Sequence, residues 1–256
     1  VCFKDASIVF PTTSRRAHAA KQFMKSLIRR FLNNRLGLRI YRGSLPFGTD
    51  LFKDIEKTFG LDSIQTVFDI GANVGQSAIR YAEHFPNARI HAFEPVSMTY
   101  GRLLENVRNR RNISPHRMAL GDKVGSGLIS LNCNSQHNSL LPHATNSSEE
   151  VEISTVDEFC KLKSIGMVDF MKIDTEGFEF KVLEGATRML TEGRVRILQL
   201  EAEQGRTKGH FVNMGDLSDY LHTYGYHLFG IFDQYCERGR LLYCNPVFLL
   251  SQGQVH

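Results

Sequence analysis

Tryptophan is absent from this 256-residue sequence, and so is any long hydrophobic run. No apolar stretch approaches the roughly 18–20 residues that a membrane-spanning helix needs, so we expect a soluble or at most peripheral protein. Hydrophobic residues make up 42% of the chain and charged residues 23%, which excludes a disordered chain, a collagen-like repeat and a small disulfide scaffold. The length predicts one large domain or two small ones.

Cysteine is scarce and scattered. The sequence has no Cys-x-x-Cys and no paired Cys/His spacing typical of zinc sites. The cysteines are odd in number, and they are Cys2, Cys133, Cys160, Cys236 and Cys244. We therefore expect reduced thiols in a cytoplasmic protein.

Acidic residues are nearly missing from the first 49 positions. Ten Lys and Arg residues stand there against a single acid, Asp5, which gives a net charge of +9, whereas the remaining 207 residues carry 21 basic and 26 acidic groups, a net charge of −5. Residues 14–36 place apolar side chains at three- and four-residue steps, which predicts a helix.

This basic helix has several possible partners. It could contact an anionic membrane surface, bind a nucleic acid or act as a targeting segment. It could also pack its apolar stripe on the domain and leave its charges in water, and we favour this interpretation. We expect residues 1–50 to form a basic helical extension to a domain at 51–256, with no nucleic-acid partner, and peripheral membrane contact through 14–36 stays open.

Beyond residue 64, apolar runs of strand length alternate with segments of helical spacing. Near-continuous apolar runs are typical of strands buried on both faces, and strand–helix alternation predicts a parallel, doubly wound α/β sheet. The expected strands are Thr66–Ile70, Arg89–Phe93, His116–Leu120, Val168–Ile173 and Arg196–Leu200, and the expected helices span 75–85, 97–109, 178–191 and 214–224.

Four further segments depart from this alternation. Residues 226–232 and 241–250 predict an antiparallel pair of strands joined by an Arg-Gly turn. Gly127–Leu131 and Val151–Thr155 predict two short extra strands. The polar stretch between these two is too long for an ordinary connection, so we expect a functional loop there.

A glycine turn follows the first expected strand. The segment Val67–Gln76 runs from an apolar strand through Asp69 into a turn with Gly71 and Gly75, and then into a helix. Glycines at such a turn let the backbone bend tightly and approach a ligand at the carboxyl edge of a parallel sheet. Glu94 ends the next strand, 23 residues after Gly71, where an acid typically binds ribose hydroxyls.

Two cofactor classes use this layout. A dinucleotide site needs a G-x-G-x-x-G series so that the pyrophosphate reaches the helix N-terminus, but Asn73 and Gln76 stand in place of the second and third glycines. Asp69, just before the turn, suits a cationic ligand. S-adenosylmethionine carries a sulfonium and an amino group and no phosphate, so the residues favour it over a nicotinamide cofactor. A nicotinamide-dependent oxidoreductase is the alternative.

Four segments together resemble the FkbM family of S-adenosylmethionine-dependent methyltransferases. They are FDIGANVGQSA, HAFEP, MALGD followed by Gly125, and MKIDTEGFEFKVLEGA, which begins at Met171. The first segment marks only the superfamily, whereas the last is specific to the family. The resemblance covers roughly residues 62–250, so the expected domain at 51–256 is an FkbM-like methyltransferase domain.

The resemblance implies a fold and a set of cofactor-binding residues. The fold is a Rossmann-like class I methyltransferase, whose seven-stranded, mostly parallel, doubly wound sheet has an antiparallel final strand. The implied cofactor residues hold the methionine end, the ribose and the adenine, and Asp122 either contacts the purine or only begins a turn. They are Asp69, Gly71, Asn73, Gly75, Gln76, Glu94, Pro95, Val96, Met118, Ala119, Leu120, Asp122 and Asp174.

The implied reaction is O-methylation of a hydroxyl group on a sugar, glycan or secondary metabolite. Such a hydroxyl needs a base, or a metal that lowers its pKa. The candidate catalytic residues are Asp174 and Glu176, which follow the fourth strand, and His137 and His210, which lie in expected loops.

The same acids could instead serve other purposes. Asp174, Glu176 and the pair Glu201/Glu203 could converge into a site for Mg²⁺ or Ca²⁺. In the alternative, Asp174 binds the amino group of the cofactor and the glutamates make local hydrogen bonds. We predict no metal.

Overall fold

The computed structural model describes residue 24 and residues 45–131, 148–203 and 212–251. The chain divides into two compact units, Val1–Pro46 and Phe47–His256. The expected helix at 14–36 lies outside the described residues except for Met24, so the extension stays a prediction. Within the described ranges, every helix is too short or too polar to cross a membrane.

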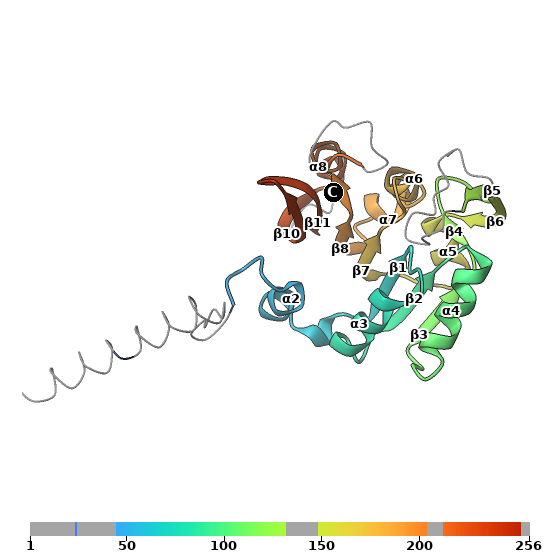
Figure 1. Ribbon diagram of the computed structural model, residues 1–256, viewed down its shortest axis with the longest axis horizontal. Helices are drawn as coiled ribbons and strands as arrows, with labels where there is room; N and C mark the ends of the chain where they lie inside the picture. The colour runs from blue at the N-terminus through green and yellow to red at the C-terminus, as the bar shows by residue number, and fades with distance from the viewer. Residues whose placement is uncertain (1–23, 25–44, 132–147, 204–211, 252–256) are drawn as a thin grey trace, which may run out of the picture. The chain divides into compact units, whose positions relative to one another are not determined.

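The second unit is built around one large sheet (Figure 1). Its strand order is β10-β11-β8-β7-β1-β2-β3, and the short strand β9 also pairs with β11. The strands β8, β7, β1, β2 and β3 are parallel to one another, whereas β11 is antiparallel to both β8 and β10. These strands are β1 (Thr66–Ile70), β2 (Arg89–Phe93), β3 (Ile113–His116), β7 (Val168–Ile173), β8 (Val195–Leu200), β9 (Ala202–Glu203), β10 (Tyr226–Glu237) and β11 (Arg240–Leu250).

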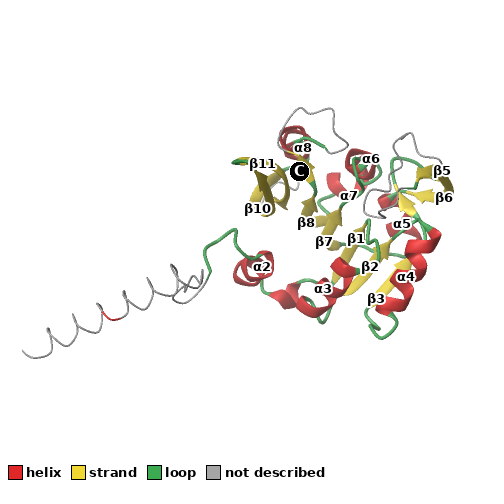
Figure 2. Cartoon of the chain, viewed as in Figure 1, coloured by secondary structure: helices red, strands yellow, loops and turns green. Residues whose placement is uncertain are grey.

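Helices cover both faces of this sheet (Figure 2). Successive strand residues point to opposite faces, so Val67 and Phe68 of β1 enter different cores. One core holds α5 (Val156–Leu162), α6 (Glu179–Glu184), α7 (Thr187–Thr191) and α8 (Met214–His222). The other holds α2 (Leu51–Phe59), α3 (Gln76–His84) and α4 (Ser97–Val107), with the short 3₁₀ helix Leu61–Ser63 beside α2.

A second, three-stranded sheet has the order β4-β6-β5. Its strands are β4 (Ala119–Leu120), β5 (Gly125–Ser130) and β6 (Ser148–Ser154). The two extra strands expected near 127 and 151 are therefore present, joined by residues outside the described ranges. The strand expected to end at Thr155 ends one residue earlier, at Ser154. The Thr155 hydroxyl accepts a hydrogen bond from the Glu158 amide and caps α5.

The expected strand His116–Leu120 is wrong. The third strand of the large sheet ends at His116, and the backbone then leaves for the second sheet, where Ala119 and Leu120 pair with β6. One apolar run thus contributes to two sheets, which periodicity alone does not separate.

The expected single helix at 178–191 is also interrupted. It ends at Gly185, and α7 begins two residues later. A Cβ atom on Gly185 would lie 1.9 Å from the backbone oxygen of Gly121, so the chain passes the second sheet at van der Waals distance there. The break in the helix therefore coincides with close packing of two backbones.

This contact predicts opposite effects for two glycine-to-alanine changes. Gly185→Ala forces Gly121 or the helix to move, and we expect a loss of about 3 kcal/mol in the free energy of unfolding. Gly101→Ala in α4 adds a methyl group in open space inside a helix, and we expect a gain of about 1 kcal/mol. Urea unfolding of both variants measures the difference, and equal stability would contradict the close contact.

Candidate functional site

A cavity of about 660 Å³ opens at the carboxyl ends of the parallel strands β1, β2, β7 and β8. This is the edge at which open α/β sheets bind ligands. The described wall includes the glycine turn after β1, the acid that ends β2, and the acidic segment after β7. Residues of the second sheet and of the β10–β11 hairpin complete it.

The glycine turn lies directly against the segment after β7. The backbone amides of Gly71 and Ala72 both donate to the Phe93 carbonyl, and Gly71 has a φ of 80°. A Cβ atom at Gly71 would lie 1.8 Å from the Asp174 backbone oxygen. Only glycine fits this turn without moving the segment that carries the acids.

Lys172 connects the two segments electrostatically. Its ammonium group lies 3.0 Å from Asp174 Oδ2, 3.4 Å from Asp69 Oδ1 and 3.4 Å from the Gly71 carbonyl oxygen. Burial alone would lower the pKa of Lys172, but the carboxylates of Asp174 and Asp69 outweigh it and hold that pKa above its usual value. The lysine is therefore charged and fixed.

Glu94 offers a buried carboxylate to the cavity. Its side chain is 7% exposed, and its Oε1 accepts a hydrogen bond from the Val96 amide. Burial raises the pKa of Glu94 to about 7. Pro95 and the segment from Met118 to Leu120 line the cavity beside it. An acid next to an apolar wall matches the needs of a ribose and a purine ring.

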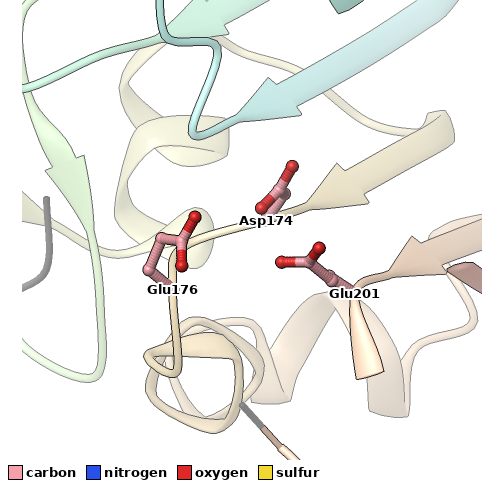
Figure 3. Close-up of side chains that lie close together, drawn as sticks. All are labelled: Asp174, Glu176 and Glu201. Atoms are coloured by element: carbon pink, nitrogen blue, oxygen red, sulfur yellow. The ribbon is translucent and has the colours of Figure 1, made fainter. Parts of the chain in front are cut away.

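Three carboxylates meet in the cavity after β7 and β8 (Figure 3). Asp174, Glu176 and Glu201 each offer one oxygen, and these oxygens all lie within 4.8 Å of one another. Burial, Asp174 and Glu179 raise the pKa of Glu176 to about 7. Burial, Asp174 and Glu176 raise the pKa of Glu201 well above its ordinary value. The cluster therefore retains protons at neutral pH, and the same oxygens would suit a divalent cation.

Glu179 fixes the shape of the acidic segment. Its Oε1 accepts hydrogen bonds from the amides of Thr175 and Gly177 and from the Thr175 hydroxyl. These bonds hold a turn in which Glu176 has a φ of 55° and Gly177 a φ of 96°. A left-handed non-glycine residue is uncommon, and here it bears the side chain of the carboxylate cluster. Glu179 thus positions the segment that carries Glu176, a role that the sequence did not predict.

The structure brings most of the predicted site residues to one cavity. Those in its wall are Gly71, Asn73, Gln76, Glu94, Pro95, Met118, Ala119, Leu120, Asp174 and Glu176. His137 and His210 lie outside the described residues, so their role as bases stays a prediction.

Four predicted cofactor residues do not line the cavity. Asp69 is fully buried behind it, where it accepts a hydrogen bond from Ser77 and pairs with Lys172. A Cβ on Gly75 would lie 2.7 Å from Leu103, so this glycine serves packing between α3 and α4. Val96 is buried in the second sheet's core.

Asp122 is the fourth of these residues. Its carboxylate accepts a hydrogen bond from Lys181, at 3.1 Å, and the structure therefore favours the turn over the purine contact.

Other residues of the wall were not among the predicted ones. They lie at the start of α2, in α3 and in the β10–β11 hairpin, and they include Asp50, Arg80, Asp233, Tyr243 and Asn245. Glu201, which the sequence offered as one of several acids that could converge, directly follows an apolar strand run, a signal in the sequence, and also lies in the wall. The hairpin residues carry no such signal because β10 extends beyond the expected 226–232 segment.

Comparison with known proteins identifies the family. Residues 69–228 match the family described as Methyltransferase FkbM domain. The chain belongs to the FkbM methyltransferase family. This membership confirms the resemblance found in the sequence and the predicted methyl donor, S-adenosylmethionine, and gives no support to a nicotinamide-dependent oxidoreductase.

Two relatives extend this comparison. Hexuronic acid methyltransferase AglP of Haloferax volcanii is 29% identical over 138 residues, which are 53% of this chain and 56% of that protein. The match thus spans little more than half the length of the curated relative. The crystal structure of methyltransferase FkbM from Methylobacillus flagellatus is similar with a TM-score of 0.51 and 17% identity, covering 73% of this chain and 43% of that one. It confirms the predicted class I fold.

The protons of the carboxylate cluster predict how stability depends on pH. When folding raises the pKa of a carboxyl group, the group stabilises the fold at pH values below its ordinary, unfolded pKa. This contribution is lost as the pH rises through the pKa of the group in the folded protein. Glu201→Gln replaces the protonated acid with an amide that does not titrate. We therefore expect its melting temperature to fall less steeply than that of the wild type between about pH 5 and pH 8.

Glu105→Gln on the exposed face of α4 is the matched control for this measurement. Thermal unfolding across the pH series should leave its slope equal to that of the wild type. Parallel curves for all three proteins would contradict the retained proton.

Proposed function

We propose that this protein transfers the methyl group of S-adenosylmethionine to a hydroxyl group of a sugar or glycan. The observation that carries the proposal is the carboxylate cluster of Asp174, Glu176 and Glu201, which shares one cavity with Glu94 and the glycine turn. A cofactor site and a group able to accept a proton thus lie in the same cavity.

The residues present fit the cofactor. Gly71 lets the turn after β1 lie against the segment that carries Asp174, and Glu94 has a buried oxygen for ribose hydroxyls. Pro95 and Leu120 supply an apolar wall for adenine, and Asp174 offers a carboxylate to the amino group. When bound, S-adenosylmethionine supplies a methyl group on a positively charged sulfur.

The chain's own residues have to orient the acceptor and remove its proton. A sugar hydroxyl is a weak nucleophile, so a nearby base lowers the barrier most when its pKa lies near the working pH. Glu176 has a pKa of about 7 and lies in the cavity wall. With S-adenosylmethionine bound, Glu176 would take the hydroxyl proton as the acceptor oxygen bonds to the methyl carbon, the carbon–sulfur bond breaks and S-adenosylhomocysteine is released. Lys172 forms an ion pair with Asp174 and holds its side chain in place beside Glu176.

The acceptor class rests on a relative. AglP is named as a methyltransferase of hexuronic acid, and it matches over 53% of this chain. The polar, carboxylate-rich wall suits an acceptor with several hydroxyl groups. We propose a sugar acceptor on this basis, with a hexuronic acid as the first candidate to test.

Removing the base should slow the reaction without weakening cofactor binding. We expect Glu176→Gln to lower kcat at least about a hundredfold, the usual contribution of general base catalysis, while the Kd for S-adenosylhomocysteine stays unchanged. The measurement is transfer of label from methyl-labelled S-adenosylmethionine to hexuronic acids and neutral hexoses, with Glu105→Gln as control. Activity abolished by EDTA and restored by Mg²⁺ would contradict the base role and assign the cluster to a cation.

Removing the carboxylate proposed to bind the ribose should instead weaken cofactor binding. We expect Glu94→Ala to weaken binding of S-adenosylhomocysteine at least about tenfold, because two ribose hydroxyls lose a charge-assisted partner. Isothermal titration calorimetry measures this affinity, and Glu105→Ala is the control. An unchanged affinity would refute the proposed cofactor position.

A further inference from the structure

The β10–β11 hairpin contributes an irregular, polar element to the cavity wall. Phe232 pairs with Asn245 and Tyr235 pairs with Tyr243, so three steps along β10 correspond to two along β11. The extra residue forms a β-bulge, a feature that changes the direction of a side chain and is frequent beside active sites. Asp233, in this bulge, has a φ of 45° and lines the cavity.

The bulge places a hydrogen-bonding pair in the wall. The side-chain amide of Asn245 donates to Asp233 Oδ2 at 3.1 Å, and both residues line the cavity. The carboxylate and the amide keep further oxygen and N–H groups for a ligand. Adjacent acceptor and donor groups of this kind match the neighbouring hydroxyls of a sugar ring.

An aromatic ring lies next to this pair on the same strand. Side chains alternate along β11, so Tyr243 and Asn245 share the cavity face while Cys244 points away and is buried. The Tyr243 ring stacks on Tyr235 with centroids 4.8 Å apart and an interplanar angle of 12°. Both tyrosines stay partly exposed, at 37% and 47%. The face of an aromatic ring carries negative charge density, which suits the C–H groups of a sugar.

The strand register brings this wall beside the carboxylate cluster. Val247 pairs with Gln199, and Cys244 pairs with Ala202, in the antiparallel ladders of β11. Between these two pairs the same register sets Asn245 opposite Glu201. A ligand held by the hairpin therefore lies one strand away from the proposed site of proton transfer.

We infer that Asp233, Asn245 and Tyr243 form the subsite that holds the sugar ring of the acceptor. Asp233 and Asn245 bind its hydroxyl groups, and Tyr243 contacts its C–H face. This inference rests on the proposed function, because it specifies where the acceptor of that reaction binds. It assigns acceptor recognition to the hairpin and cofactor binding to the turn after β1.

The test uses the full chain saturated with S-adenosylhomocysteine or supplied with labelled S-adenosylmethionine. The probes are methyl β-glucuronide and methyl β-glucoside. Binding is followed by saturation-transfer NMR, and transfer is followed by KM and kcat. Asp233→Asn changes the charge but keeps the backbone, because asparagine accepts a positive φ as readily as aspartate. Asp219→Asn, on the exposed side of α8 and away from the cavity, is the control.

We expect Asp233→Asn to raise the KM for the sugar about tenfold, the loss of one charge-assisted hydrogen bond, with kcat and cofactor affinity nearly unchanged. Tyr243→Leu should raise KM by a similar factor, whereas Tyr243→Phe, which keeps the ring, should stay near the wild-type value. These changes should leave the melting temperature near that of Asp219→Asn.

The outcomes separate this inference from the proposed function. Methyl transfer to a sugar with an unchanged KM in Asp233→Asn and Tyr243→Leu would overturn the subsite and leave the proposed function standing. Sugar binding that these variants weaken, without methyl transfer by the wild type, would support the subsite and overturn the proposed function. Absence of both binding and transfer in the wild type would overturn both.

Discussion

The ion pairs of Lys172 hold the site together. One ammonium group contacts a carboxylate inside β1, a carboxylate after β7 and the carbonyl of the glycine turn. Burying a charge is costly unless it is paired, so each partner depends on the others. The two strands are neighbours in the sheet, and the lysine fixes the loops that leave them. The cavity wall owes its shape to this connection.

A second constraint acts on the acids of the same wall. Glu176 and Glu201 approach Asp174 closely enough that their charges repel, and burial increases the cost. Protons relieve the repulsion, and the pKa of Glu176 rises to about 7, near neutrality. Groups of this kind are suited to proton exchange, which hydroxyl methylation requires. Glu179 enforces the arrangement by holding the left-handed turn that carries Glu176.

The regular part of the fold could be predicted from the sequence. β1, β2 and β7 have the expected bounds because each is a short apolar run with a clear end. The run at 116–120 failed because its residues serve two sheets, which only tertiary pairing decides. The single helix expected at 178–191 was wrong because the chain is interrupted at Gly185, where two backbones pack closely, and periodicity does not reveal such a contact.

The site was predicted in part, for related reasons. Glycines and acids at strand ends mark positions that the chain order reveals, such as Gly71 and Glu94. The cofactor role of Asp69 stays a prediction, and its ion pair is with a lysine 103 positions away in the chain. Contacts of this length have no local signal. The wall formed by the hairpin arises from a bulge, and bulges depend on the pairing of two strands.

The contact between Gly121 and Gly185 has a consequence for any exchange of segments between relatives. Gly121 of the MALGD segment and Gly185 of the segment that begins at Met171 pack so closely that a Cβ atom on Gly185 has no room. The two stretches of sequence are therefore in backbone contact, although the glycines are 64 positions apart. A chimera that takes either stretch from a relative must keep glycine at position 185. Gly185, in the segment typical of the family, is therefore required for the contact between two backbones and has no chemical role in this contact.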